Sequence, residues 1–557
     1  MKNKERVLVI GIDGGTFDVI QPMVERGELP AIASIMRDGV WGNLSSTIPS
    51  VTSPAWFSFF SGVNPGKLGV FYLTRDSHGT YDEGPPVDVS KIPVKFLWHY
   101  LGDHREKVLC IIPFPFPPQK VNGIMVTNIK VDVVENTATF KSYPAEIGQE
   151  ISDILSSNEV IESKKHFKRS HASNSKEEYL NNVIKMSNIT TEINKELSLH
   201  LLNRYEWDFF ITVFNTPDAI EHLFWSYMDP SHPLYSVKGR KVYGNVVYDT
   251  YRQVDKAIGD ILRQAGDVTV IIVSDHGMGP IHKFFYVNRW LIEKGILKIK
   301  GDRSKPSLSM TRVPLKNIAE KVKIRANHIP NLSIPVMRRK SLPIPEEIDW
   351  THTKAYATIF GININLEGRE PQGVVKNDEY DKVCESLREE LQQLRDPETG
   401  EKIIEKVYKR GEIYSGPYLE DAPDIVYLFK QPFYYVKKDL FSNEVFKRIT
   451  DRETIRANHL NHSSKGIFLA KGLHINSKGP LEGVRIIDVA PTILYLMGLP
   501  IPKNMDGRLL EEILQQGLMS DRPPVYVDAA DSPERVEGLS HDEEEKVMEQ
   551  LRQLGYV

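Results

Sequence analysis

The chain has 557 residues, 41% of them hydrophobic and 26% charged, which is typical of a globular protein rather than a fibrous or low-complexity one. Its 70 basic and 74 acidic residues leave a formal net charge of −4, so the overall charge does not favour nucleic acid as a partner. The two cysteines, Cys110 and Cys384, are too few for a disulfide scaffold or a thiolate metal site.

The beginning of the chain runs directly into a strand-like segment, without the apolar region and small-residue cleavage site of a secretory signal peptide. No apolar run reaches the roughly 18 residues that a helix needs to span a bilayer. We therefore expect no membrane-spanning segment and a cytoplasmic location.

Short apolar runs that end at Gly or Asp recur along the chain and predict buried strands of a parallel sheet, at residues 6–15, 107–116, 207–218 and 267–277. Helical patterns lie between them, for example over residues 243–266. The same strand signal returns at 465–472 and is followed by an apolar stretch at 486–500. This alternation predicts an α/β fold in which helices cover both faces of the sheet.

The strand signals predict a core that is discontinuous along the chain, because segments of different character separate them. We expect the core in residues 1–130, 200–297 and 446–510, a helical insertion in 131–199, a basic segment followed by an α+β cap in 298–445, and a C-terminal extension with a terminal helix in 511–557.

The basic segment has a charge pattern of its own. Residues 298–340 hold twelve Lys or Arg and two acids. A solvated excursion between domains explains this pattern, and so does a lid or a peripheral contact with an anionic membrane surface. The sequence leaves these alternatives open and does not predict the oligomeric state.

Carboxylates and imidazoles follow the predicted strands, where ligands bind in open parallel sheets. They are Asp13, Asp218, Asp275 and His276, joined by His222, four residues after Asp218, and by a late imidazole, His462. A helix that starts near Asp218 places Asp218 and His222 on one face. Oxygen and nitrogen donors without thiolates suit zinc or manganese in a catalytic site. Six such side chains can hold two cations, the arrangement that supports displacement at phosphorus.

Displacement at phosphorus by such a two-cation site also needs a nucleophile. The stretch SVTSPAWFSFFSG at 50–62 offers two hydroxyls, Thr52 and Ser53. Ser and Thr at a helix start usually cap free backbone N–H groups. A free hydroxyl is a poor nucleophile at neutral pH and needs a base or a metal. The stretch alone allows both interpretations and either hydroxyl.

Five segments in fixed order, IGIDGG, PSVTSPAWFSFFSGVNPGKLGVF, NTPDAIEHLFW, VSDHGMG and NHSSKGIFLAKG, resemble the alkaline phosphatase superfamily. Within it they are most similar to the type I phosphodiesterase / nucleotide pyrophosphatase family. The resemblance implies an alkaline-phosphatase-like, mostly parallel sheet sandwiched by helices, with inserted cap segments.

Carried over by motif, the resemblance implies two metal sites, most simply zinc with manganese as the alternative. Asp218, His222 and His462 would hold one metal. Asp13, Asp275 and His276 would hold the second, together with the nucleophile's oxygen. The family's nucleophile stands two residues before the proline, which is Thr52 and not Ser53. His459 competes with His462, but the spacing to the next glycine favours His462.

The implied function is hydrolysis of a phosphodiester or pyrophosphate bond in a small phosphoester substrate through a phospho-threonine intermediate. A phosphomonoesterase, a phosphoryl or headgroup transferase, and a non-catalytic binding homologue are the alternatives. Trp56 stands where a sulfatase carries Arg. Ala55 stands where nucleotide pyrophosphatases typically carry Asn, and Leu68 where a family His often stands.

Two cap segments, GREPQG at 368–373 and GPYLEDAPDIVY at 416–427, look like recurrent segments of bacterial and archaeal family members. Arg369 and Glu370 could contact substrate, but a structural turn explains them better. The same applies to Asp421 and Asp424.

Overall fold

The computed structural model describes residues 5–76, 80–81, 83–132, 137–155, 176–301, 344–358, 360–450, 460–476, 479–528, 544–545 and 548. Most of the predicted basic segment lies outside the described residues, as do His459 and most of the predicted C-terminal extension after residue 528.

Nine described strands form one large sheet in the order β20-β2-β19-β9-β1-β8-β5-β6-β7. Its middle, from β9 to β6, is parallel throughout. The strands are β1 (Val7–Ile12), β2 (Val40–Ser45), β5 (Val108–Ile112), β6 (Gly123–Asp132), β7 (Thr137–Tyr143), β8 (Phe209–Phe214), β9 (Thr269–Val273), β19 (Lys465–Lys471) and β20 (Gly479–Arg485).

Both faces of this sheet are buried, which is why its strands are almost uniformly apolar. In β1, Val7 and Val9 pack into one hydrophobic cluster, whereas Leu8 and Ile10 pack into the other. Successive side chains of a strand point to opposite faces, so one apolar run serves two clusters. The apolar runs therefore predicted the α/β class correctly.

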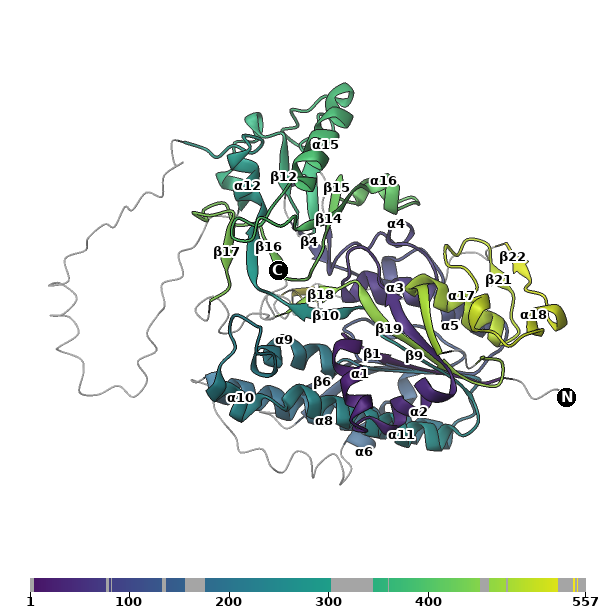
Figure 1. Cartoon of the computed structure of the whole chain (residues 1–557). Helices are drawn as coiled ribbons and strands as arrows, with labels where there is room; N and C mark the ends of the chain where they lie inside the picture. The colour runs from purple at the N-terminus through teal and green to yellow at the C-terminus, as the bar shows by residue number, and fades with distance from the viewer. Residues whose placement is uncertain are drawn as a thin grey trace.

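Helices cover both faces of the sheet (Figure 1). One cluster contains residues of α3 (Thr52–Ser61), α5 (Leu97–Asp103) and α17 (Val489–Leu496). The other contains residues of α1 (Phe17–Glu25), α2 (Pro30–Asp38), α6 (Gly148–Leu155), α8 (Lys176–Arg204), α9 (Thr216–Met228) and α11 (Val246–Ala265).

Two strands differ from what the sequence patterns suggest. The predicted helical insertion at 131–199 begins with a strand, because β7 pairs antiparallel with β6 at the sheet edge. Ala138 and Phe140 pack on the core while Thr139 between them is exposed, a strand pattern with one buried face. The late strand β19 runs antiparallel to both of its neighbours, β2 and β9. An apolar run in the sequence does not indicate whether the strand is parallel or antiparallel to its neighbours.

The predicted cap contains a second sheet of four strands in the order β12-β13-β15-β14, with a hydrophobic cluster of its own. Its elements are β12 (Ala355–Ala357), β13 (Gly361–Ile364), β14 (Ile404–Lys409), β15 (Ile425–Phe429) and α15 (Asn377–Gln392). The helix α12 (Val287–Glu293), which precedes the predicted cap, packs into the same cluster. A three-stranded sheet adjoins it, in which β11 (Lys283–Tyr286) lies between β16 (Tyr434–Lys437) and β17 (Phe446–Arg448). The domain boundaries remain predictions.

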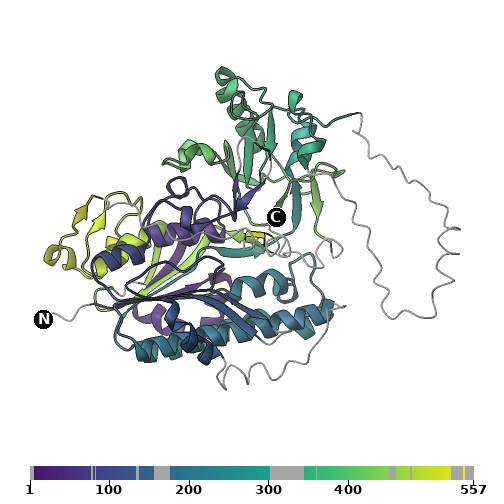
Figure 2. The same cartoon turned by 180° about the vertical axis from the view of Figure 1, so that it is seen from behind.

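A further, two-stranded sheet is formed by strands that neighbour those of the large sheet in the chain. Its strand β10 (Gly277–Pro280) begins four residues after the end of β9 and pairs antiparallel with β18 (Leu460–Ser463). Figures 1 and 2 both show the cap elements on the side of the large sheet where this two-stranded sheet lies, away from β21 (Ile501–Pro502) and β22 (Tyr526–Val527). The remaining elements are α4 (Pro65–Leu68), β3 (Thr74–Asp76), β4 (Glu83–Pro86), α10 (Val237–Tyr243), α14 (Ile344–Glu347), α16 (Arg410–Ile413), α18 (Leu518–Asp521) and short 3₁₀ turns.

Candidate active site

The carboxyl ends of three adjacent parallel strands bring the predicted polar residues together. Asp13 follows β1, Asp275 follows β9, and Asp218 lies in the first turn of α9, just after β8. The approach is close: a Cβ on Gly14, whose φ is +71°, would lie 3.1 Å from the Cα of Asp218. Only glycine combines that backbone conformation with that contact, which explains the Gly after Asp13.

The first group of potential ligands is Asp218, His222 and His462, whose donor atoms all lie within 4.8 Å of one another. Nε2 of His222 lies 3.3 Å from Oδ1 of Asp218 and 3.0 Å from Nε2 of His462. Asp218 and His222 lie on one face of α9, as their spacing in the sequence predicts. His462 reaches them from β18, more than two hundred residues along the chain.

The second group contains Asp13, His276 and, again, Asp218. Nε2 of His276 lies 3.7 Å from Oδ1 of Asp13 and 3.1 Å from Oδ2 of Asp275. The other oxygen of Asp275 accepts a hydrogen bond from the Gly14 amide at 3.2 Å. All six predicted residues therefore meet, with Asp218 placed between the two groups.

Hydrogen bonds to backbone carbonyls fix the tautomers of two of the imidazoles. Nδ1 of His462 lies 3.0 Å from the carbonyl oxygen of Ser50, and Nδ1 of His276 lies 3.2 Å from that of Gly277. A carbonyl oxygen can only accept, so each Nδ1 carries a proton, and the neutral form of each ring has its lone pair on Nε2. The Nε2 atoms face the carboxylates, so in the neutral rings their lone pairs are directed as metal ligation requires.

Several buried carboxylate oxygens in this cluster accept no hydrogen bond from the described residues: Oδ1 of Asp13, Oδ1 of Asp218 and Oδ2 of Asp275. Burial, and then the charges of Asp275 and Asp218, raise the pKa of Asp13 well above its usual range. Burial also raises the pKa of Asp275. Unsatisfied buried carboxylates are costly, and divalent cations bound by oxygen and nitrogen would satisfy them. The donor set therefore fits two cations.

The hydroxyl of Thr52 reaches the same cluster. Thr52 is the first residue of α3, and its Oγ1 lies 3.3 Å from Nε2 of His276. Val51 is the N-cap and supplies no side-chain cap. The first turn of α3 thus presents backbone N–H groups next to the cluster without a side chain that caps them.

Three separate segments hold the loop that precedes Thr52. The hydroxyl of Ser46 donates to the carbonyl of Asp275 at 2.5 Å, and His462 donates to Ser50. From the cap, the hydroxyl of Tyr414 donates to the carbonyl of Ile48 at 2.7 Å. The sequence reasoning missed Ser46 and Tyr414. Tyr414 lies two residues before the cap segment 416–427, which the motif comparison had singled out.

A fourth carboxylate, which the sequence reasoning also missed, lies under the cluster. Glu221 is fully buried in α9, and its Oε1 accepts a hydrogen bond from the hydroxyl of Tyr251 at 2.9 Å. Its Oε2 accepts none from the described residues and lies 3.3 Å from the Cβ position that a side chain at Gly14 would occupy. The available signal was an acidic residue inside the apolar part of NTPDAIEHLFW.

The cap residues considered as substrate contacts bind each other instead. Arg369 donates to Asp424 through both terminal nitrogens, at 2.9 and 2.6 Å, and to the carbonyl of Ile364 at 2.6 Å. Tyr380 donates to Asp424 as well, at 2.7 Å. These contacts support the structural interpretation of Arg369 and Asp424. Glu370 is buried beside Arg369, and Asp421 ends an exposed 3₁₀ turn.

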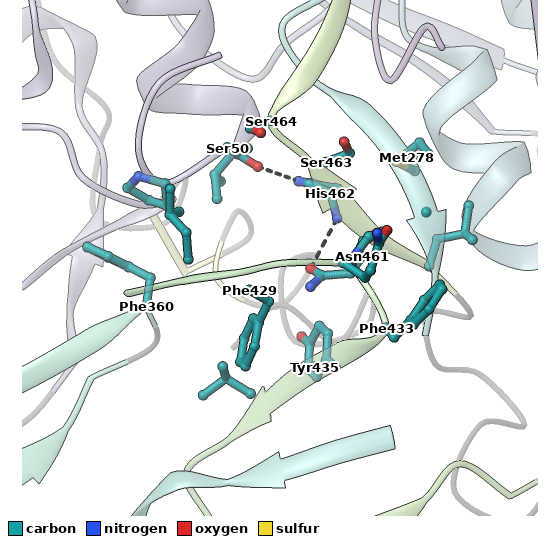
Figure 3. A pocket seen from close by; sticks show the side chains of 18 of the residues that line it. Ser50, Met278, Phe360, Phe429, Phe433, Tyr435, Asn461, His462, Ser463 and Ser464 are labelled. Carbon is teal, nitrogen blue, oxygen red and sulfur yellow. Dashed lines mark hydrogen bonds between the residues drawn. The ribbon is translucent and has the colours of Figure 1, made fainter. Parts of the chain in front are cut away.

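A cavity of about 880 Å³ opens beside the cluster. His222, His462 and Ser50 border it on one side, and residues 426–433, 435 and 436 of the cap border it on the other. Figure 3 shows the rings of Phe360, Phe429 and Tyr435 across the cavity from Ser50 and His462. This volume is at the upper end of the range for small-molecule sites.

Comparison with known proteins identifies the family. The family model described as type I phosphodiesterase / nucleotide pyrophosphatase matches residues 7–459. The chain belongs to this family. The match includes every predicted ligand except His462, together with Thr52, and the membership confirms the resemblance drawn from the five segments. As a family member, the protein is a phosphoric ester hydrolase of the phosphodiesterase and pyrophosphatase type.

A search of solved structures finds two that align with this phosphodiesterase family member at low identity. An AMP complex of an inactive variant of murine ectonucleotide pyrophosphatase / phosphodiesterase 5 superposes with a TM-score of 0.47 and 13% identity, over 92% of this chain and 100% of that chain. Phosphonoacetate hydrolase from Sinorhizobium meliloti, bound to phosphonoformate, gives a TM-score of 0.47 and 13% identity, over 88% and 95%. No curated protein matches the chain.

None of the helices in the described part of the phosphodiesterase family member combines the length and apolar character that crossing a bilayer requires.

Proposed function

We propose that the protein hydrolyses a phosphodiester or pyrophosphate bond with Thr52 as the nucleophile and two divalent cations as cofactors. The convergence of the Thr52 hydroxyl with six oxygen and nitrogen donors carries this proposal. Asp218, His222 and His462 would hold one cation. Asp13, Asp275 and His276 would hold the other, with Asp218 between them. Zinc is the proposed metal and manganese the alternative.

Bound cations would lower the pKa of the attacking hydroxyl and neutralise charge on the phosphoryl group and on the leaving oxygen. The attack on phosphorus and the binding of the phosphoryl oxygens are carried out by groups of the chain itself. The Thr52 oxygen forms a bond to phosphorus while the bond to the leaving group breaks, which gives a phospho-threonine. The uncapped N–H groups of α3 face the phosphoryl oxygens and stabilise their charge. Water then hydrolyses the phospho-threonine and restores the hydroxyl.

The test is hydrolysis of bis-p-nitrophenyl phosphate by the purified protein after it is loaded with zinc or manganese. Thr52→Ala should abolish release of p-nitrophenolate, whereas its neighbour Ser53→Ala should not, because only Thr52 is proposed to attack. Acid quenching during turnover should trap a p-nitrophenyl phosphoryl group on Thr52 of the wild-type protein, because only one of the two p-nitrophenyl groups leaves when Thr52 attacks. A dead Ser53→Ala variant beside an active Thr52→Ala variant would contradict the assignment.

Two further proposals rest on the sequence. We infer a cytoplasmic location, in line with two buried cysteines that form no disulfide. We also infer a peripheral contact with anionic membranes through residues 298–340, most of which lie outside the described residues. Cell fractionation tests the first. Binding to anionic vesicles that weakens with salt tests the second, and binding that salt leaves unchanged would refute it.

A further inference from the structure

The short loop of residues 13–16, which carries Asp13 into the cluster, is held at every backbone N–H group. The four acceptors, in chain order of the donors, are the carbonyl oxygen of Phe214, Oδ1 of Asp275, the carbonyl oxygen of Ile12 and the hydroxyl of Tyr251. The first three acceptors lie in or just after strands of the large sheet. The fourth, Tyr251, comes from helix α11 and is the only one outside the sheet and its strand ends.

The hydroxyl of Tyr251 makes two hydrogen bonds of opposite sense. It accepts from the N–H of Thr16 at 3.2 Å and donates to Oε1 of Glu221 at 2.9 Å. A phenolic hydroxyl can accept and donate at the same time, so the two bonds are compatible and together orient it. Tyr251 and Glu221 are both fully buried. Bulk water therefore cannot take the place of either bond.

Glu221 belongs to the helix of the first ligand group. In α9 it lies three residues after Asp218 and directly before His222. Its other oxygen, Oε2, lies against the same loop, 3.3 Å from the position that a Cβ on Gly14 would occupy. The Glu221–Tyr251–Thr16 bridge thus fixes the end of the Asp13 loop relative to α9.

We propose that Tyr251 and Glu221 are positioning residues, which hold the loop of Asp13 in place for the second cation. The inference depends on the proposed function, which assigns that cation to Asp13, Asp275 and His276. Neither positioning residue needs to touch the cation or the substrate. Hydrogen-bonding groups behind metal ligands typically change metal affinity by about 10–100-fold, so loss of the bridge should weaken the second cation about tenfold.

The first experiment is zinc binding to the metal-free protein, measured by competition with a chromogenic chelator. Tyr251→Phe removes the hydroxyl and keeps the ring. One of the two zinc ions should bind about tenfold more weakly than in the wild type, and the other should bind unchanged. Two unchanged affinities would overturn the proposal. Equal weakening of both ions would also overturn it, because the bridge would then support the cluster as a whole.

Two backgrounds identify the ion that is weakened. Asp13→Asn lacks a ligand of the second cation, and His222→Ala lacks a ligand of the first. Adding Tyr251→Phe should leave the remaining zinc affinity unchanged in Asp13→Asn and lower it about tenfold in His222→Ala. The opposite pattern would assign the bridge to the first cation and overturn the proposal.

The matched control is Tyr243→Phe. Tyr243 packs in the same hydrophobic cluster, but its hydroxyl donates to Asn181 of α8 at 3.5 Å and not toward the Asp13 loop. Both zinc affinities should stay unchanged in this variant. A loss equal to that of Tyr251→Phe would overturn the proposal, because removal of any buried hydroxyl from this layer would then suffice.

Glu221 provides a second, independent pair of variants. Glu221→Gln keeps an acceptor for the Tyr251 hydroxyl and should keep the wild-type zinc affinities. Glu221→Met has no such acceptor and should reproduce the effect of Tyr251→Phe. Combining Glu221→Met with Tyr251→Phe should cause no further loss, because both changes remove the same bridge. Equal losses in Glu221→Gln and Glu221→Met would contradict the role of the hydrogen bond.

The dependence of the rate on zinc separates positioning from general damage. With bis-p-nitrophenyl phosphate, Tyr251→Phe should need about tenfold more free zinc for its half-maximal rate and should then reach the wild-type kcat. A kcat that stays low at saturating zinc would overturn the proposal. The binding experiment needs no turnover, so its result does not depend on the role of Thr52. A wild-type protein that binds fewer than two zinc ions would refute the proposed function as well, whereas two ions with affinities unchanged in Tyr251→Phe would refute this inference alone.

Discussion

The active-site cluster and the cap both bury carboxylates, but they treat them in opposite ways. In the cap, Asp424 accepts four hydrogen bonds, from Arg369 twice, Tyr380 and the Ile364 amide. In the cluster, Asp13, Asp218 and Asp275 each keep a buried oxygen that accepts none from the described residues. Burying a charge is costly unless it is paired. Asp424 thus has all its partners within the chain, whereas the three cluster carboxylates have imidazoles nearby and buried oxygens that bound cations would satisfy.

Loss of the nucleophile should have the largest effect. Thr52→Ala removes the hydroxyl 3.3 Å from His276, and kcat should fall at least about a thousandfold because no other group replaces an attacking oxygen. Steady-state kinetics with bis-p-nitrophenyl phosphate measure this. Cation content should stay close to that of the wild type, since six donors remain, and the adjacent Ser53→Ala should remain within about twofold of the wild-type rate.

A matched pair of Asp→Asn variants tests the contrast between the two regions by its effect on stability. Asp424→Asn breaks a fully paired buried carboxylate, so the free energy of unfolding should fall by about 3–5 kcal/mol. Asp13→Asn removes a carboxyl group whose pKa is already raised by burial and by the neighbouring aspartates. The metal-free protein should therefore lose no stability, while binding of the second cation is lost.

Thermal unfolding with and without zinc, together with metal analysis, measures both variants. Zinc should raise the Tm of Asp424→Asn, which keeps all six donors, more than that of Asp13→Asn. If Asp13→Asn destabilised the metal-free protein as much as Asp424→Asn does, the contrast between the two carboxylate classes would be wrong.

A smaller effect is expected where the cap supports the nucleophile's loop. Tyr414→Phe removes the hydrogen bond to the carbonyl of Ile48, four residues before Thr52. One such bond is worth about 1 kcal/mol, so kcat should fall up to about fivefold while KM and cation content stay unchanged. Tyr408→Phe, in the neighbouring strand β14, serves as the control. An equal fall in kcat in both variants would show that the effect comes from general damage to the cap.

The smallest effect at neutral pH concerns another paired carboxylate of the cap, Asp396. Burial acts to raise its pKa, but hydrogen bonds from Lys283 and Tyr434 outweigh it and lower the pKa to about 2. Because the folded pKa lies below the unfolded value of about 3.9, this group stabilises the fold above about pH 4 and loses that contribution as the pH falls toward 2. Acid unfolding of the wild type should be steeper in this window than that of Asp396→Asn.

Much of the large sheet and of the site was accessible to sequence reasoning, for identifiable reasons. The apolar runs of β1, β5, β8 and β9 predict strands because both faces are buried, and the parallel sheet places their carboxyl ends at one edge. The i,i+4 spacing of Asp218 and His222 predicts a shared helix face. The helical insertion was less well predicted, because β7 is an edge strand with one packed face and a polar composition.

Contacts between distant segments could not be predicted from local patterns. Glu221 looks like an ordinary helix residue until α9 is packed against Gly14 and Tyr251. Tyr414 acquires a role only because its cap segment lies against the loop before Thr52. The same applies to the cavity, whose aromatic wall comes from residues 360, 429, 433 and 435 and whose opposite wall comes from residues 50 and 462.

The sequence by itself determined the α/β class and the family, and it predicted the seven residues of the candidate site, including the position of Thr52 relative to the proline. Each of these depends on short-range order along the chain: strand length, helical spacing, or residues next to one another in a motif. Tertiary structure alone decided that Asp218 lies between the two ligand groups, and that Asp424 of the cap has hydrogen bonds to both oxygens while three cluster carboxylates each keep an oxygen that accepts none from the described residues. It also decided that a cavity opens between the cluster and the cap. These are properties of distance and solvent exclusion between segments hundreds of residues apart, and only the packed chain defines them.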